Sequence, residues 1–129
     1  MYSPSVLTWP FVGTIAAGWP SPAEEELLDT ISFDDWLIQD SSFMLKVTHN
    51  AMQDAGIHEN DIIIVQRGKQ PRLGDIVVAE IDSKWVLRYY QVENKQIALY
   101  PANGMYEILR PEASLTIIGT VTACIRKYY

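Results

Sequence analysis

The sequence predicts a mainly β domain, built from twisted antiparallel sheets or a small β-barrel. From Phe43 onward, short runs rich in Val, Ile, Tyr or Trp alternate with breaks of turn-forming residues. No part of that region carries the sustained 3.6-residue period of a long helix. We expect strands over residues 61–66, 75–82, 84–93, 96–100 and 115–127, with a further strand-like run that contains Phe43, Leu45 and Val47.

The first forty residues have a different character. Residues 1–10 read as a loosely ordered arm, and residues 11–17 as a short extended run that Gly18 closes. Pro20, Pro22 and three consecutive glutamates then favour an exposed linker. Residues 27–40 are expected to be irregular, with one short strand or turn. We therefore predict a flexible N-terminal arm over residues 1–22 and a folded domain over residues 23–129.

Composition limits the classes of function. A hydrophobic share of 48% with 20% charged residues, in 129 residues, is typical of one well-packed domain. Ten Lys and Arg against sixteen Asp and Glu give a net charge of −6, which would repel a phosphate backbone. A small barrel that stacks oligonucleotide bases on Trp85, Tyr89 and Tyr90 would need a basic face, and the composition counts against it.

The sequence lacks the patterns that usually indicate secretion, membrane attachment or a bound metal. The single cysteine, Cys124, excludes an internal disulfide, fits a reducing cytoplasm and is expected to be a buried, inert thiol. The first residues carry neither a basic n-region nor a sustained apolar block, so we expect no signal peptide and no membrane anchor. Neither His49 nor His58 belongs to a pattern with zinc spacing, and we predict no metal and no cofactor.

The candidate site lies in residues 46–65, KVTHNAMQDAGIHENDIIIV. They read as a strand end, a polar turn, a tight bend over residues 51–56, and a continuous apolar strand. Such a bend leaves backbone N–H groups free to point at a ligand or a reacting atom. A nucleophile would occupy its central residue, and here that residue is Ala51.

Four blocks in the same order resemble the carboxy-terminal domain of the LexA repressor and the UmuD mutagenesis protein, the self-cleaving serine–lysine peptidases of the S24 family. They are FVGTIAAGWPSP at 11–22, KVTHNAMQDAGIHENDIIIV at 46–65, GDIVVAEIDSKWVLRYY at 74–90 and LYPANGMYEI at 99–108. The resemblance covers nearly the whole chain from about Phe11. It implies a mainly β fold of the LexA and signal-peptidase type.

The resemblance also implies a cleavage site. Members of this family cut their own chain at a small-residue–glycine bond before a short proline-containing segment, and Ala17–Gly18 matches that bond. Small residues suit a bond that must enter a narrow cleft of the same molecule, and glycine permits the required backbone geometry. On its own, the dipeptide is equally consistent with a flexible corner.

Catalysis in the family uses a serine in the bend and a lysine on a later strand. Where the family has Gly-X-Ser-Met, this chain has His49, Asn50, Ala51 and Met52, so the cleft and oxyanion neighbourhood would be Asn50 and Met52 around an alanine. The lysine position falls on Arg88. Alanine has no hydroxyl with which to attack, and arginine, whose pKa is above about 12, cannot act as a general base.

Neighbouring residues are not expected to replace the missing pair. Lys84 shares a strand face with Arg88 but lies about 13 Å along the strand, at about 3.3 Å per residue. Thr48 is expected to point elsewhere, and His49 to have no nucleophile beside it. We therefore expect no self-cleavage. Two origins fit, either substitutions made to hold an uncut form or a natural pseudo-peptidase, and the unusual His49 favours the second.

The resemblance implies a cytoplasmic, homodimeric regulatory domain of the bacterial DNA-damage (SOS) response that contacts the activated RecA filament. No helical pattern precedes Phe11, so the chain would be either a UmuD-like partner of an error-prone DNA polymerase or a fragment of a longer repressor. The alternative is a non-enzymatic dimerisation or interaction domain. No membrane contact and no direct contact with nucleic acid are expected.

Overall fold

The computed structural model describes residues 8–11, 13–15, 17–18, 24–25, 30–39, 41–111 and 114–129. The chain divides into two compact units, residues 1–39 and residues 40–129, and each is described by itself. The predicted boundary between residues 22 and 23 lies outside the described residues. No helix in the described ranges is long and apolar enough to cross a membrane.

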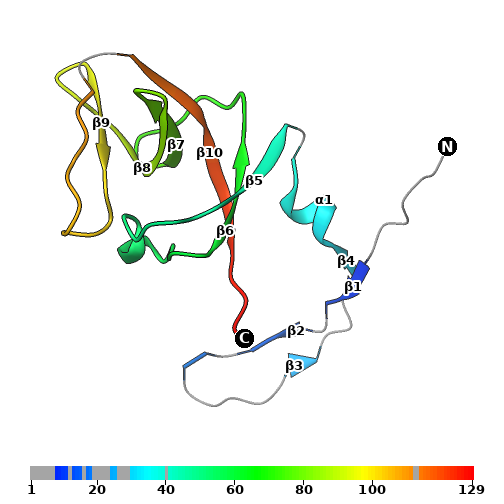
Figure 1. Ribbon diagram of the computed structural model, residues 1–129. Helices are drawn as coiled ribbons and strands as arrows, with labels where there is room; N and C mark the ends of the chain where they lie inside the picture. Colours follow the sequence, from blue (N-terminus) through cyan, green and yellow to red (C-terminus); the bar gives the residue numbers. More distant parts are fainter. Residues whose placement is uncertain are drawn as a thin grey trace. The chain divides into compact units, whose positions relative to one another are not determined.

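The first unit contains two small antiparallel ribbons and one helical turn (Figure 1). Strand β1 (Thr8–Pro10) pairs with β4 (Thr30–Ser32), and β2 (Gly13–Thr14) pairs with β3 (Glu24–Glu25). Helix α1 (Phe33–Leu37) follows β4 directly, because the Ser32 hydroxyl caps it by accepting from the N–H of Asp35 at 3.4 Å. The segment expected to be irregular over residues 27–40 thus contains a strand and a one-turn helix.

The second unit is built on one six-stranded antiparallel sheet, which confirms the mainly β fold class. Its strands lie side by side in the order β5-β6-β10-β7-β8-β9, so β10 returns to the middle of the sheet (Figure 1). Their bounds are Ser42–Lys46 for β5, Ile62–Gln66 for β6, Ile76–Ile81 for β7, Lys84–Glu93 for β8, Gln96–Tyr100 for β9 and Leu115–Ile125 for β10.

Two tight hairpins connect β7, β8 and β9. Both central residues of each turn, Asp82 with Ser83 and Asn94 with Lys95, have positive φ between 50° and 64°. Two-residue turns of this kind match the right-handed twist of the strands they join. These two turns set the ends of β8. They also set its register, in which Ile81 lies opposite Lys84 and Glu93 lies opposite Gln96.

Strands β6 and β7 are buried on both faces of the sheet. Because side chains alternate along a strand, Val78 belongs to one apolar cluster, whereas Val77 and Ala79 belong to another. The first cluster also contains Met52 and Ile57 from the bend that precedes β6. Packing of the bend therefore depends on the same core as packing of the sheet.

Strand β10 carries two irregularities, one between Ile117 and Gly119 opposite β7 and one between Val121 and Ala123 opposite β6. Bulges of this kind bend a strand and increase its twist. At Gly119 the neighbouring strand approaches closely: a Cβ atom there would lie 2.6 Å from Val65 Cγ1 and 2.7 Å from the Gln66 carbonyl oxygen. The curvature of the central strand thus depends on the absence of a side chain at Gly119.

Replacing Gly119 with alanine should destabilise the second unit. The added methyl group must displace a buried valine and a backbone carbonyl, and overpacking of this kind costs about 1–3 kcal/mol. The free energy of unfolding, measured by denaturant titration, gives the size of the effect. Gly104→Ala is the matched control, because nothing lies within 4 Å of a Cβ placed there. Equal stability of the two variants would contradict the close approach.

Candidate functional site

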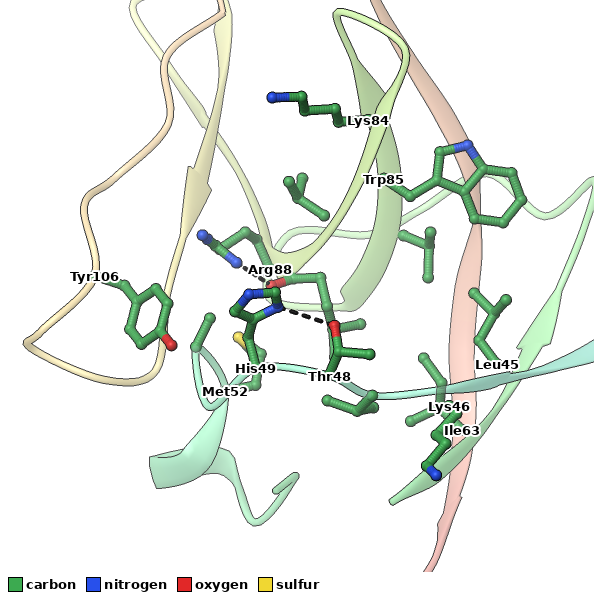
Figure 2. A pocket seen from close by; sticks show the side chains of 15 residues that line it. Leu45, Lys46, Thr48, His49, Met52, Ile63, Lys84, Trp85, Arg88 and Tyr106 are labelled. Carbon is green, nitrogen blue, oxygen red and sulfur yellow. Dashed lines mark hydrogen bonds between the residues drawn. The ribbon is translucent and has the colours of Figure 1, made fainter. Parts of the chain in front are cut away.

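A pocket of about 510 Å³ opens between the bend and strand β8, and it is called the groove from here on (Figure 2). Its lining comes from β5 and the bend, from β6, β7 and β8, and from the loop after β9. The lining residues are Leu45, Lys46, Val47, Thr48, His49, Ala51, Met52, Ile63, Val78, Lys84, Trp85, Val86, Leu87, Arg88 and Tyr106. Ala51 and Arg88, which are 37 positions apart in the sequence, therefore line one cavity.

The tight bend and its flanking residues, together residues 47–61, are held by hydrogen bonds between their own backbone groups; this whole segment is called the bend below. The N–H of Val47 donates to the Asp61 carbonyl at 2.8 Å, and the N–H of Asn60 donates to the Val47 carbonyl at 2.7 Å. Inside this closed loop lies the 3-10 turn η1 (Gln53–Ala55), and Gly56 ends it with a φ of 86°. A residue with a Cβ atom rarely adopts that φ, so glycine suits the corner.

A second loop, residues 101–106, holds the bend from the other side. The N–H of Ala102 donates to the Ala51 carbonyl at 2.7 Å, and the Asp54 N–H donates to the Ala102 carbonyl at the same distance. The Asn103 side-chain amide donates to the Asn50 carbonyl at 2.8 Å. This loop lies within the block at 99–108 that resembles the family. No local sequence pattern predicts that it contacts the bend.

An ion pair between a buried aspartate and an exposed arginine joins the bend to the chain just after the last strand. The carboxylate of Asp61, 2% exposed, accepts from Arg126 Nε and Nη2, both at 2.7 Å. Arg126 also donates to the Gly56 carbonyl, and Asp61 accepts from the His58 N–H at 2.8 Å. The Arg126 guanidinium holds the pKa of Asp61 far below its usual range, even though burial acts in the opposite direction.

Cys124 lies beside this ion pair and does not match the prediction of a buried thiol, because the residue is exposed. Its Sγ donates to Asp61 at 3.4 Å. Although the residue as a whole is exposed, its sulfur atom is partly shielded from water. This desolvation and the neighbouring Asp61 carboxylate raise the pKa of Cys124 to about 11. The thiol therefore stays protonated at neutral pH, and its expected low reactivity has an electrostatic cause.

At the centre of the bend, Ala51 is 4% exposed and Met52 is 1% exposed. Within the described part of the chain, the backbone N–H groups of these two residues donate to no acceptor. Asn50 does not line the groove; its N–H donates to the Tyr106 hydroxyl at 3.4 Å, and its side-chain oxygen accepts from Glu59. Two adjacent backbone donors at the centre of the bend therefore have no acceptor among the described residues.

Arg88 lies on β8 and is half-buried. Its Nη1 donates to the Leu87 carbonyl at 2.8 Å, and its guanidinium carbon lies 5.7 Å from the centre of the Tyr106 ring. Its Nε is buried and has no hydrogen-bond partner among the described residues. Burial lowers the pKa of Arg88, and Tyr106 opposes the shift, yet a guanidinium remains cationic at neutral pH.

Thr48 and His49 differ from the sequence prediction. Both line the groove, and the Thr48 hydroxyl lies 2.9 Å from His49 Nδ1 (Figure 2), so the histidine does have a hydroxyl beside it. Both side chains are exposed, and no third group in the described residues orients the imidazole. We therefore assign this neighbour contact no catalytic role. Lys84 also lines the groove, beside Trp85.

The remaining predicted site residues, Ala17 and Gly18, lie in the first unit. Both are exposed, and nothing lies within 4 Å of a Cβ placed on Gly18. The proline-containing segment that follows, residues 19–22, lies outside the described residues. Assignment of Ala17–Gly18 as a cleavage site, and of Ala51 and Arg88 as the nucleophile and base positions, stays a prediction.

The groove thus lies between a strand–bend–strand segment and the long hairpin of β7 and β8. The family model described as Peptidase S24-like matches residues 10–122. The chain belongs to that family, which confirms the resemblance found in its sequence.

Three relatives illustrate the similarity. The chain is 37% identical over 119 residues to a LexA repressor of Acetivibrio thermocellus and 38% identical over 124 residues to one of Caldicellulosiruptor saccharolyticus. These matches cover 92% and 95% of this chain, but only 56% and 61% of the repressors. It is also 34% identical over 119 residues to Protein SamA of Salmonella typhimurium, covering 91% of this chain and 84% of SamA.

Loss of the Asp61 carboxylate should weaken the bend and change how stability depends on pH. The folded pKa of Asp61 lies below the unfolded value of about 3.9, so its stabilising effect is present above about pH 4 and is lost as pH falls. Asp61→Asn should lower the free energy of unfolding at pH 7 by at least about 1.5 kcal/mol, a typical value for hydrogen bonds to a charged group. It should also flatten the decline of stability between about pH 5 and pH 3.

Denaturant titrations of the wild type and the variant at several pH values measure both effects. Asp54→Asn, which removes an exposed carboxylate from the same bend, is the matched control for the change in net charge. An Asp61→Asn variant as stable as the wild type at pH 7, with the same pH slope, would contradict the role given to this ion pair.

Proposed function

We propose that this chain is a LexA/UmuD-type regulatory domain of the bacterial DNA-damage response that has the groove of a self-cleaving peptidase but does not cut itself. The observation that carries the proposal is the pair of residues at the two catalytic positions. Ala51 and Arg88 line one groove, beside the free N–H groups of Ala51 and Met52. This is where the family resemblance expects a serine and a lysine.

The chemistry of the groove supports inactivity. Serine–lysine cleavage needs a hydroxyl that attacks a carbonyl and a neutral amine that takes the hydroxyl proton. Ala51 offers a methyl group, and the Arg88 guanidinium stays protonated even when half-buried. Two free backbone donors could still polarise a carbonyl, but polarisation without a nucleophile does not break a peptide bond.

Partners follow from the family. In active relatives, according to the resemblance, the activated RecA filament favours the state in which the Ala17–Gly18 equivalent occupies the cleft; the same contact is proposed here, together with homodimerisation. Because the chain spans 56–61% of the two LexA repressors and 84% of Protein SamA, two settings are open. It would act within a longer repressor or as an accessory of an error-prone DNA polymerase.

The alternative is a non-enzymatic dimerisation or interaction domain for which cleavage is irrelevant. Both readings predict an uncut wild-type chain. They differ in what the groove retains: a decayed groove would not regain cleavage when the catalytic pair is restored, whereas a scaffold that lost only its reacting groups would.

Restoring the pair by Ala51→Ser and Arg88→Lys together should produce self-cleavage between Ala17 and Gly18. At alkaline pH, near the lysine's ordinary pKa of about 10.4, the amine loses its proton without help from the surroundings, so the reaction then depends on the fold and the groove geometry. Intact mass spectrometry of the purified protein should show a fragment that begins at Gly18. The wild type and both single variants should remain whole.

Cutting by the wild-type chain would contradict the proposed inactivity. A double variant that folds, as judged by its thermal unfolding, but stays whole after prolonged incubation would favour the non-enzymatic alternative with a decayed groove, and would contradict the proposal that only the reacting groups were lost. A triple variant that also carries His49→Gly tests whether the imidazole obstructs the groove, because the family has glycine at that position.

Binding to the RecA filament is tested separately. The wild-type chain should co-sediment with RecA assembled on single-stranded DNA in the presence of a slowly hydrolysed ATP analogue, and not with the DNA alone, as its net charge of −6 implies. Sedimentation equilibrium of the chain alone should give a dimer. Equal pelleting with and without RecA would contradict the partner assignment.

A further inference from the structure

The charge of the groove differs from that of the chain. The whole sequence has a net charge of −6, yet none of the described residues that line the groove is an aspartate or a glutamate. Three cationic side chains, Lys46, Lys84 and Arg88, do line it. Clefts with one sign of charge and apolar walls concentrate ligands of the opposite sign. The groove is therefore suited to an anionic group.

Arg88 is the cation with the most to gain from such a group. Among the described residues, its buried Nε has no partner, and the hydrogen bond that its side chain makes goes to the neutral Leu87 carbonyl. A half-buried guanidinium that lacks a carboxylate is a costly arrangement in a chain with sixteen acidic residues. The Tyr106 ring lies near the guanidinium, whose carbon is 5.7 Å from the ring centre, and Figure 2 shows both side chains in the groove. Burial lowers the pKa of Arg88, which is consistent with a cation that lacks its counter-ion.

The bend supplies a second set of donors. The N–H groups of Ala51 and Met52 make no hydrogen bond within the described residues, and both residues line the same groove. Adjacent backbone N–H groups together with an arginine are a typical environment for a carboxylate. Because residue 51 is alanine, no hydroxyl occupies the space next to these donors.

We propose that the groove binds the free carboxy-terminus of an extended peptide, with the terminal carboxylate between Arg88 and the N–H groups of Ala51 and Met52. The inference deepens the proposed function, because it assumes that this groove no longer cuts. A terminal carboxylate fits better than an acidic side chain, since a chain end places its two oxygens on the backbone, where a scissile carbonyl would otherwise lie. The ligand then resembles the product of a cleavage reaction, and the groove acts as a receptor for it.

The test uses one peptide in two forms. Phe-Val-Gly-Thr-Ile-Ala-Ala, the sequence of residues 11–17, is prepared with a fluorescent amino-terminal label, once as the free acid and once as the primary amide. Fluorescence anisotropy with the full chain gives both dissociation constants. The acid should bind at least about tenfold more tightly than the amide, as expected for charge-assisted hydrogen bonds. Raising the salt concentration should reduce this ratio only partly, because the site is partly buried.

Variants show which side chain is responsible. Arg88→Gln should bring the acid-to-amide ratio close to one, whereas Arg88→Lys should retain part of it. Arg67→Gln is the matched control, because Arg67 directly follows β6 and packs on the Phe43 ring, and neither residue lines the groove. It should leave the ratio unchanged. If Arg88→Gln does not fold, the wild-type comparison of acid and amide still decides.

Several outcomes would overturn the proposal. They are equal binding of acid and amide, no binding of either form at millimolar concentration, and a tenfold preference that survives Arg88→Gln. A peptide amide whose last residue is replaced by glutamate tests the other source of a carboxylate; if it binds as tightly as the free acid, the assignment to a chain end is wrong. Intact mass of the protein in the same samples tests the proposed inactivity separately, so self-cleavage and loss of peptide binding are told apart.

Discussion

The ion pair between the buried Asp61 and the exposed Arg126 is the interaction on which the site depends. It joins three parts of the second unit: the residue just before β6, the turn that ends at Gly56, and the chain just after β10. A carboxylate at 2% exposure is stable there because it receives two short bonds from one guanidinium and a third from the His58 N–H. The bend that carries Ala51 is thereby anchored to the middle strand of the sheet, and the loop at residues 101–106 holds its other side.

The anchored bend lines a groove from which, under the proposed function, the reacting serine and lysine are missing. Two backbone donors and a cation surround a position where the chain offers only a methyl group. The same features that exclude acyl transfer favour binding. A permanently charged guanidinium cannot accept a proton, but it can bind a carboxylate in a partly buried site. Under the two proposals, loss of catalysis and gain of a ligand site follow from the same two residues.

Much of the sheet could be predicted from the sequence, because turn residues mark where its strands end. Strands β8 and β9 were predicted to the residue, since Asp82, Ser83, Asn94 and Lys95 adopt the positive φ of tight hairpins. The last strand was predicted to reach residue 127 but ends at Ile125, and Arg126 leaves the ladder to bind Asp61. In the site, the pairing of Ala51 with Arg88 came from the resemblance to a family, not from local pattern. The contacts of Asn103 and Tyr106 with Asn50 span more than fifty residues, and nothing in a single sequence reports them.

Both proposals rest on one groove that brings together an alanine, two backbone donors without an acceptor and an arginine without a carboxylate partner among the described residues. A crystal structure of the chain grown without added carboxylates would test this arrangement. Ala51 and Arg88 should line the same groove, and no protein carboxylate should lie within hydrogen-bond distance of the Arg88 guanidinium. Finding the two residues on opposite faces of the sheet, or Arg88 paired with an aspartate or glutamate of its own chain, would contradict it.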